Sequence, residues 1–412
     1  MKILIINTSD IQGGAARAAY RLHKSLLAQD VDSQMLVQSK TSDDFTVINE
    51  NKKVRKYFNK LRPVIDSIPT RSYKNKTNTL FSPSWFGFSK IVDKINEINP
   101  DIVHLHWINA GMMKIEDIAR IKAPIVCSLH DMWAFTGGCH YNEECNGYEK
   151  NCGNCKVLGS DKEKDLSKKV FNRKQKVFDS KKDMTIVGLS SWLNNASKSS
   201  TLLKDKYHLN LPNPIDTDVF KPFDKEKARE LWGLPKDKKL VLFGAMGATS
   251  DPRKGFKELS EALHQLENKD VEFVVFGSSK PQDAPDLGFK THYLGHLHDD
   301  VGLVTLYSAV DVMIVPSLQE NLSNAIMESL ACGTPVIGFN IGGNGDMIEH
   351  KKNGYLAKPF DTTDLKDGIE WVLNNDKYDE LCTNAREKVV KEFDSKVVAR
   401  KYIELYKQVL ND

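Results

Sequence analysis

The stretch Pro316 to Asp346, PSLQENLSNAIMESLACGTPVIGFNIGGNGD, decides the fold of this chain. The apolar run over residues 310–315 stops at Pro316, as a buried parallel strand does. Residues 324–331 then have the pattern of an amphipathic helix, and glycine followed by proline ends it. A second apolar strand over residues 335–339 leads into the glycine loop 342–345. This order of strand, loop, helix, strand and glycine turn predicts a parallel sheet covered by helices.

Two glutamates in this stretch are candidate binding residues. Glu320 is expected in the loop above the strand, and Glu328 about two turns along the helix. Ligands of open parallel sheets bind at the C-terminal ends of strands, against helix N-termini. Two carboxylates on one rim can accept paired hydrogen bonds from a polyol such as a ribose or hexose. Two glutamates alone would more often mark a solvated helix face, and the neighbouring strand and glycine loop favour the binding site instead.

Length and composition indicate a soluble globular protein. The chain has 412 residues, of which 40% are hydrophobic and 27% charged, enough for two or three domains. No apolar stretch reaches the roughly 18 residues of a membrane span. The N-terminal residues MKILIIN enter a strand directly, without a signal-peptide cleavage pattern. We therefore expect a cytoplasmic location.

The net charge of +3 hides an asymmetry between the halves. Residues 1–212 have 33 Lys and Arg against 22 Asp and Glu, a net charge of +11, and residues 213–412 have 25 against 33, a net charge of −8. The basic residues of 52–76 alternate with apolar ones, which suits peripheral contact with an anionic membrane at its inner face, or a polyanionic acceptor. Plain solubility, or a basic helix covering the sheet, explains the pattern equally well. No nucleic-acid-binding module is recognisable, so no nucleic acid partner is expected.

The N-terminal segment predicts a second place for phosphate. A strand over Lys2–Asn7, a helix over Ala15–Gln29 and a strand over Val31–Gln38 form a βαβ unit, with Gly13 and Gly14 at the helix start. Backbone N–H groups at such a start can bind phosphate. The fingerprint G-x-G-x-x-G is absent, so dinucleotide binding is not supported. An ordinary tight turn is the plainer interpretation of the two glycines.

Histidines follow the next predicted strands. The strand at 101–106 contains His104 and His106, and the strand at 125–131 ends in His130 and Asp131. Polar residues at successive strand ends are typical of an edge that lines a cleft. A single histidine there is more often structural, but three on one expected rim predict that at least one contacts ligand.

Four cysteines fall within seventeen residues. Cys139, Cys145, Cys152 and Cys155 lie in the run GGCHYNEECNGYEKNCGNC. Four thiols on a loop in a reducing compartment favour a structural zinc ion over disulfides, although the spacing is irregular for a zinc ribbon. Reduced thiols or a redox pair remain alternatives. A catalytic zinc is not expected, because four thiolates leave no open position.

A second βα series begins after the Pro- and Asn-rich turn at 211–218. A strand at 240–243 ends in Gly244, and a basic turn, Arg253-Lys254-Gly255, precedes the helix at 256–266. A strand at 271–276 ends in Gly277, and a long terminal helix is expected over 395–410.

In this order the motifs resemble family 4 retaining glycosyltransferases of the GT-B fold. The resemblance spans nearly the whole chain, and LHDMWAFTGGCHY with its cysteines looks like the subset that builds bacterial surface polysaccharides, such as colanic-acid-type transferases. The motifs that carry it are Gly13-Gly14, His130-Asp131, Pro212-Asn213-Pro214, Arg253-Lys254-Gly255, Glu320 with Glu328, ACGTPV and Gly342-Gly343.

The resemblance implies two Rossmann-like parallel-sheet domains facing across a cleft. Residues 1–212 would bind a glycan or polyprenyl-linked acceptor, residues 213–390 would bind a UDP- or GDP-sugar donor, and the helix in 391–412 would cross back to the first domain. Arg253 and Lys254 would hold the diphosphate, Glu320 the donor sugar, Glu328 the ribose and His130 the transferred sugar. The family has arginine after the first glycine of the donor domain, whereas Ala245 stands here, and Arg253 is expected to supply that charge. The remaining donor contacts would come from Gly13, Gly14, Gly244, Gly277, Leu297, Asn321, Leu322 and Ser323.

The implied reaction is metal-independent hexosyl transfer with retention. Fixed cations and helix N-termini would stabilise the charge that develops on the leaving diphosphate. A phosphate oxygen would take the acceptor's proton, so no enzyme nucleophile or base is named. Two alternatives stay open, a nucleotide-sugar epimerase of the same architecture and a non-catalytic glycosyltransferase-like partner subunit.

Overall fold

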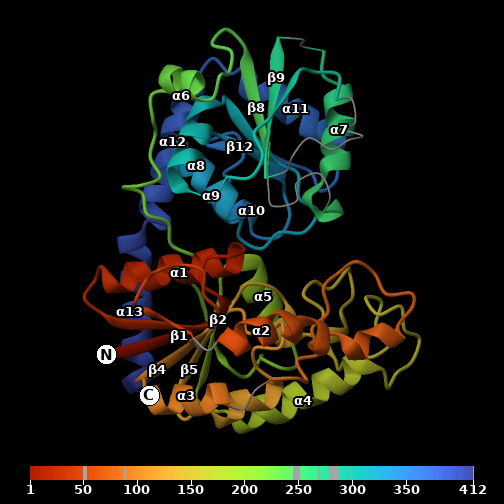
Figure 1. The fold of residues 1–412 in the computed structure, drawn as a ribbon. Helices are drawn as coiled ribbons and strands as arrows, with labels where there is room; N and C mark the ends of the chain where they lie inside the picture. The colour runs from red at the N-terminus through yellow and green to blue at the C-terminus, as the bar shows by residue number, and fades with distance from the viewer. Residues whose placement is uncertain are drawn as a thin grey trace. The chain divides into compact units, whose positions relative to one another are not determined.

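The computed structural model describes residues 1–49, 53–87, 90–244, 251–267, 270–277, 287–297 and 299–411. The chain divides into two compact units. Unit 1 contains Met1–Pro214 together with Val398–Asp412, and unit 2 contains Ile215–Val397. Each is a parallel sheet with helices packed on it (Figure 1). No helix within the described ranges is both long and apolar enough to cross a membrane.

The unit 1 sheet has the strand order β3-β2-β1-β4-β5-β6-β7 in the described residues, and each neighbouring pair is parallel. From β1 the chain builds outward through β2 and β3, then returns to add β4 on the other side of β1. This reversal opens a crevice at the C-terminal ends of β1 and β4. The strands are β1 (Lys2–Ser9), β2 (Asp32–Ser39), β3 (Val47–Ile48), β4 (Ile102–Leu105), β5 (Ile125–Leu129), β6 (Met184–Gly188) and β7 (Tyr207–Asn210).

The unit 2 sheet repeats this topology. Its described strands are parallel in the order β10-β9-β8-β11-β12-β13, so the reversal lies between β8 and β11. The strands are β8 (Lys239–Gly244), β9 (Val271–Phe276), β10 (Thr291–Tyr293), β11 (Val312–Val315), β12 (Val336–Phe339) and β13 (Gly354–Ala357). The expectation of two Rossmann-like parallel-sheet domains is therefore confirmed.

Helices cover both sheets. In unit 1 they are α1 (Gly14–Leu27), α2 (Lys53–Asp66), α3 (Lys90–Ile98), α4 (Leu166–Ser180), α5 (Ser191–Ser199) and the short turns η1 (Ile68–Ser72), η2 (Ile115–Arg120), η3 (Trp133–Phe135) and η4 (Gly147–Glu149). In unit 2 they are α6 (Lys225–Leu231), η5 (Pro252–Lys254), α7 (Phe256–His264), α8 (Asp300–Ala309), α9 (Asn324–Ala331), α10 (Asn344–Met347), α11 (Thr362–Leu373) and α12 (Tyr378–Glu392). The last helix, α13 (Ser395–Asn411), begins in unit 2 and continues into unit 1.

Local chemistry explains why α9 has the predicted ends. The Ser323 hydroxyl accepts a hydrogen bond from the backbone N–H of Ile326, which caps the first turn. Gly333 takes a positive φ of 76° just beyond the last turn, a conformation that glycine adopts at little cost. Strand β12 begins at Val336, one residue later than predicted, because Pro335 has no N–H to donate to a neighbouring strand.

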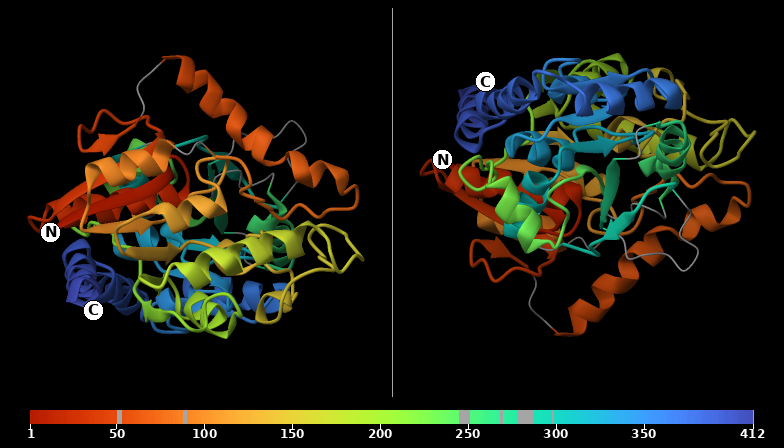
Figure 2. Two further views of the ribbon diagram at one scale, coloured as in Figure 1. Left: turned by 90° about the horizontal axis from the view of Figure 1, so that it is seen from below. Right: turned by 90° about the horizontal axis from the view of Figure 1, so that it is seen from above.

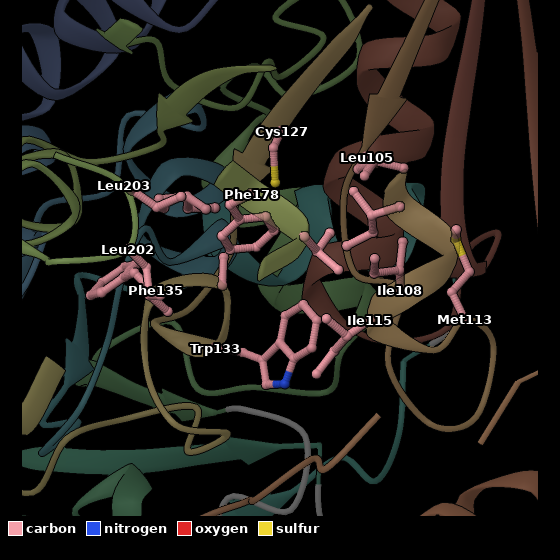
Figure 3. Packing of buried hydrophobic residues seen from close by; sticks show 14 of the residues in the cluster. Leu105, Ile108, Met113, Ile115, Cys127, Trp133, Phe135, Phe178, Leu202 and Leu203 are labelled. Atoms are coloured by element: carbon pink, nitrogen blue, oxygen red, sulfur yellow. The ribbon is translucent and has the colours of Figure 1, made fainter. Parts of the chain in front are cut away.

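The core of unit 1 lies between its sheet and the helices α3 and α4. Strands β4 and β5 are buried throughout, so their apolar side chains pack on both faces of the sheet. Figure 3 shows part of this cluster, in which Leu105, Cys127, Trp133 and Phe178 are labelled. Trp133 therefore belongs to the core, although it lies only two residues after the rim residue Asp131.

The C-terminal part of α13 is anchored by two buried tyrosines. The Tyr406 hydroxyl forms a hydrogen bond with Nδ1 of His104 (2.7 Å), and the Tyr402 hydroxyl lies 3.3 Å from Oγ of Ser128. All four side chains are buried. The terminal helix thus completes unit 1 by satisfying polar groups on β4 and β5.

The variant Tyr406→Phe should lower the free energy of unfolding by about 1–3 kcal/mol, because it leaves a buried His104 nitrogen without its partner. Urea denaturation of the full chain measures the change. The matched control is Tyr207→Phe, which removes a hydroxyl from a tyrosine that is 56% exposed and should have little effect. Equal stability of the two variants would contradict this role for Tyr406.

Candidate functional site

The sequence-predicted loop of unit 2 lies at the reversal of strand order. β8 ends at Gly244 and β11 at Val315, so the segment from Pro316 onward leaves the sheet at the switch point. Ligands of such sheets bind there. The turn η5, which carries Arg253 and Lys254, meets the same segment, because the N–H of Leu318 donates to the Arg253 carbonyl (2.8 Å).

Lys254 and Glu320 form an ion pair across these two loops. Lys254 Nζ lies 3.2 Å from Glu320 Oε2, and the side chains are 26% and 15% exposed. The other carboxylate oxygen accepts a hydrogen bond from the N–H of Asn321 (3.2 Å). Both charged groups keep contact with solvent, so either can exchange its partner for a ligand group.

Two glycines let these loops touch. At Gly255, with φ of 71°, a Cβ atom would lie 1.8 Å from the Pro316 carbonyl oxygen. At Gly342, with φ of 50°, a Cβ atom would lie 1.8 Å from the Glu320 carbonyl oxygen. Only glycine fits both the conformation and the space. The two contacts fix the backbone on either side of the Lys254–Glu320 pair.

Arg253 pairs with an acidic residue of its own turn. Its guanidinium pairs with Asp251, with Nη2 2.7 Å from Oδ2 and Nε 3.1 Å from Oδ1. This pairing lowers the pKa of Asp251, so the carboxylate stays charged. Binding of an anion by Arg253 would require exchange of this partner. Ala245 and the rest of 245–250 lie outside the described residues.

Glu328 is buried, with 3% of its surface exposed. The Tyr307 hydroxyl on α8 donates to its Oε2 (3.0 Å). This contact holds the carboxylate in place and leaves it an acceptor for further hydroxyl groups. Tyr307 was not predicted as a site residue, because its helix is mostly apolar and buried and gives no sign of a functional hydroxyl.

The other predicted donor residues lie on neighbouring strand ends. Gly277 follows β9, and its N–H donates to the Gly295 carbonyl (2.7 Å), which joins the loops after β9 and β10. Leu297 lies two residues further along this second loop, half-buried. Asn321, Leu322 and Ser323 form the buried entry to α9. At Gly244 any side chain would collide with the Phe276 ring, 2.0 Å from the Cβ position.

The switch point of unit 1 lies between Asn7–Thr8 and Trp107. Asn7 Oδ1 accepts from the Trp107 N–H (2.9 Å), and the Thr8 N–H donates to the Trp107 carbonyl (2.8 Å). Gly13 is the N-cap of α1 with φ of 95°, and nothing lies within 4 Å of its Cβ position. Gly14, the first helical residue, is exposed. The space at the Gly13 Cβ position is thus open.

The three predicted histidines are brought together. His106 Nδ1 lies 2.8 Å from His130 Nε2, and the rings of His104 and His106 are tilted by 39° with centroids 4.3 Å apart. Burial lowers the pKa of His104 to about 3 and that of His130 to about 4, and it holds the pKa of His106 well below its usual value. The group is therefore uncharged at neutral pH.

Asp131 links His140, Trp107 and Trp133 beside these histidines. It accepts hydrogen bonds from the Trp107 indole (3.0 Å) and the Trp133 N–H (2.8 Å), and it lies 2.6 Å from His140 Nδ1. Burial raises the pKa of Asp131, but His140 and the N–H donors outweigh it, so the pKa is lowered. His140 lies in an irregular loop nine residues after Asp131, where sequence patterns gave no reason to choose it.

The four predicted cysteines line one small cavity and form no disulfide. Cys139 and Cys155 are buried, whereas Cys145 and Cys152 are half-buried. Within the described part of the chain, no three His, Cys, Asp or Glu side chains are grouped closely enough to be recognised as a metal site. The four thiols therefore line one cavity, but their sulfur atoms do not converge on a single point.

The buried histidines predict loss of stability in acid. Their folded pKa values lie below the unfolded value near 6.5, so below that pH the unfolded chain binds more protons. Stability is complete above about pH 6.5 and falls as the pH decreases, by roughly 2 kcal/mol per fully buried histidine at pH 5. Urea midpoints at pH 7.5 and 5.0 measure this loss.

Replacing one of the histidines should reduce that dependence on pH. His106→Gln removes one buried titrating ring, so its stability should differ less between pH 7.5 and 5.0 than that of the unmodified chain. His264→Gln, a change at an exposed position on α7, serves as control and should leave the dependence unchanged. Identical pH profiles for all three proteins would contradict the assignment.

Comparison with known proteins agrees with this architecture. Residues 12–169 match the family described as Glycosyltransferase Family 4, and residues 224–389 match Glycosyl transferases group 1. The sequence is 29% identical over 211 residues to phosphatidyl-myo-inositol mannosyltransferase of Mycobacterium tuberculosis, covering 48% of this chain and 53% of that protein. It is 24% identical over 264 residues to N-acetyl-alpha-D-glucosaminyl L-malate synthase of Bacillus anthracis, covering 56% and 66%. The matches thus span about half to two thirds of these relatives.

Solved structures share the whole fold. Sucrose-phosphate synthase from Thermosynechococcus elongatus superposes with a TM-score of 0.69 at 18% identity, over 100% of this chain and 99% of that one. HepE of Anabaena, in complex with UDP and glucose, superposes with a TM-score of 0.66 at 17% identity, over 99% of each chain. One glycosyltransferase family model thus matches within each unit, and the chain has the fold of these solved structures.

Proposed function

We propose that this chain transfers a hexose from a nucleotide-diphosphate sugar to a glycan or lipid-linked acceptor, with retention, in the synthesis of a bacterial surface polysaccharide. The observation that carries the proposal is the Lys254–Glu320 pair at the switch point of unit 2. A cation that remains partly exposed there suits a diphosphate, and the neighbouring carboxylates suit sugar hydroxyls. HepE, which shares the fold, is described with UDP and with UDP-glucose, and a UDP- or GDP-sugar is the donor proposed here.

The proposed chemistry needs no catalytic metal and no enzyme nucleophile. As the sugar leaves, negative charge grows on the diphosphate, where Lys254 stabilises it after exchanging Glu320 for a phosphate oxygen. The N-terminus of α9, capped by Ser323, adds its dipole. The acceptor hydroxyl attacks from the leaving group's face, and its proton passes to a phosphate oxygen. Glu320 and Glu328 bind hydroxyl groups in this scheme and exchange no proton.

In unit 1 we assign the transferred sugar to His130. The His106–His130 contact fixes the orientation of the ring, and burial keeps it uncharged. A neutral imidazole can form one hydrogen bond with a sugar hydroxyl without requiring a counter-charge. Gly13 and Gly14 at the start of α1 would allow the backbone to approach the donor phosphate.

The variant Lys254→Ala should lower kcat for transfer by about 10²–10³-fold, because it removes a fixed charge from the developing diphosphate. A panel of nucleotide diphosphates, screened by thermal shift, first identifies the base, since a ligand that binds only the folded state raises the melting temperature. Lys257→Ala is the matched control, because this lysine is 82% exposed on the next turn of the chain and pairs only with Glu261 among its described neighbours.

Glu328→Ala provides an independent test and should weaken nucleotide binding. If Lys254→Ala and Glu328→Ala both keep full transfer activity, the assignment of the site is wrong. Release of free epimerised sugar from donor alone would instead support the epimerase. A chain that neither hydrolyses donor nor transfers sugar from any nucleotide in the panel would support the non-catalytic subunit.

We also propose that unit 1 contacts the inner face of an anionic membrane through α2 and η1. Leu61 and Val64 on α2 and Ile68 at the start of η1 are 53%, 47% and 47% exposed. Arg62 and Asp66 of the same helix are buried. The polarity is thus inverted, with apolar groups outward. Figure 2 shows α2 at the outer margin of the unit in both views.

Basic side chains border this apolar face. Lys60, Arg71, Lys74 and Lys76 are exposed along the same stretch of chain. An apolar face with basic borders fits the boundary between anionic headgroups and acyl chains. Each cation near such a surface contributes roughly 1 kcal/mol, so binding should weaken in high salt.

The double variant Leu61→Asp/Val64→Asp should abolish sedimentation of the chain with vesicles that contain phosphatidylglycerol. Vesicles of phosphatidylcholine alone should not bind the unmodified chain. Val219→Asp, at an exposed apolar position in unit 2, is the control and should still sediment. Equal binding of all three proteins, or no binding of the unmodified chain at low salt, would refute the proposed membrane contact.

A further inference from the structure

The cavity lined by the four cysteines is framed by groups that suit metal-bound thiolates. The Gly147 N–H donates to Cys145 Sγ at 3.4 Å. Cys155 is buried, and its backbone is fixed by the hydrogen bond that its N–H donates to Asp165 Oδ2 at 2.9 Å. A neutral thiol is a weak acceptor, whereas a thiolate that binds a metal is held by such donors.

Gly147 has no side chain to occupy the space beside the half-buried sulfurs of Cys145 and Cys152. A Cβ atom there would lie 3.3 Å from Cys145 Sγ and 3.7 Å from Cys152 Sγ. The loop around them is strained, because Glu143, Glu144 and Cys152 take positive φ values of 44°, 62° and 49°. Such conformations persist where another interaction holds them. A metal ion bound by the cysteines would supply that interaction.

A buried cation lies beside the cavity. Lys174 on α4 is fully buried, and its Nζ donates to the carbonyls of Trp133 and Thr136 and lies 3.8 Å from the centroid of the Trp133 ring. Thr136 also lines the cysteine cavity. No salt bridge to Lys174 occurs among the described residues. Burial lowers the pKa of Lys174 to about 7, and negative charge on Cys139, Cys152 and Asp131 would oppose that shift and favour the ammonium.

Charge balance connects these observations. Four thiols that bind one zinc ion release four protons and form a complex of net charge −2. A buried charge is costly unless an opposite charge lies near it. An uncompensated ammonium and an uncompensated anionic complex would each be unfavourable here, and together they offset each other.

We propose that Cys139, Cys145, Cys152 and Cys155 bind one structural zinc ion as thiolates, and that the Lys174 ammonium is its buried counter-charge. The sulfurs line the cavity without converging on one point, so binding draws the half-buried Cys145 and Cys152 toward the buried Cys139 and Cys155. The ion would fix the loop that follows Trp133 and carries His140, and hence the hydrogen bonds to Asp131.

Metal analysis of the reduced full-length chain, purified without chelator, should find close to one zinc per chain. The cobalt-substituted chain should show the thiolate-to-metal and d–d absorption bands of a tetrahedral four-sulfur site. Cys145→Ser should lose zinc and these bands, whereas Cys382→Ser, a half-buried cysteine of unit 2, should keep both. A zinc-free chain whose four thiols all react with a thiol reagent, or are joined as disulfides, would overturn the proposal.

The counter-charge is tested by two matched lysine variants. Lys174→Met should release zinc to a colorimetric chelator about 10–100-fold more readily than the unmodified chain, the range seen when groups that support metal ligands are removed. Lys181→Met, a second buried lysine bonded to Asp183 and two carbonyls, should release zinc normally. Equal zinc release by both would overturn the role of Lys174.

If Lys174→Met fails to fold, zinc release from the unmodified chain at rising salt replaces it. A buried counter-charge predicts release that is independent of salt, and release that accelerates with salt would contradict it. The proposal is independent of sugar transfer, because zinc content and cobalt spectra are measured without donor or acceptor.

Discussion

The candidate site of unit 2 depends on two places where backbone touches backbone. Gly255 lies against the Pro316 carbonyl and Gly342 against the Glu320 carbonyl, each with a left-handed φ. An alanine at either position would have to displace a main chain that is itself held at the end of a buried strand. The loops that carry Lys254 and Glu320 therefore have little freedom to separate. Charged groups that are already in position stabilise a transition state without a cost of rearranging the chain. These contacts hold the backbone of the two loops in position.

The sequence indicated the elements better than the contacts between them. The helix at 324–331 was predictable at both ends, because its cap serine and its terminal glycine act locally. The Tyr307–Glu328 contact was not, since it joins two helices across 21 positions and Tyr307 lies in an apolar run. Likewise, the sequence shows Arg253 as a cation near Lys254, but it does not show that the guanidinium pairs with Asp251. Periodicity and caps report local geometry, whereas partner choice depends on how elements pack.

Unit 1 shows the same limit in a different form. The three histidines were predicted to share a rim because parallel strands end on one edge, and the structure brings them into contact. The hydrogen-bond partners at these strand ends could not be predicted from the sequence. Tyr406 of the terminal helix contacts His104, and His140 of an irregular loop contacts Asp131. Each partner is a polar group that satisfies another polar group in the interior. Such pairing is obligatory in a folded protein, but any of several distant residues could have provided it.

The candidate binding residues at the strand ends of unit 2 are an ion pair, whereas those of unit 1 are neutral histidines. This difference affects what each set of residues can bind. In unit 2 the Lys254–Glu320 pair stays partly exposed, so its lysine can be reached by an anion. In unit 1 burial holds His104, His106 and His130 neutral, and their hydrogen bonds run to hydroxyls and to each other. Neutral donors and acceptors in a dry environment distinguish hydroxyl patterns well and bind a diphosphate poorly. Under the proposed function, the exposed cation of unit 2 suits the diphosphate, and the neutral histidines of unit 1 suit hydroxyl groups.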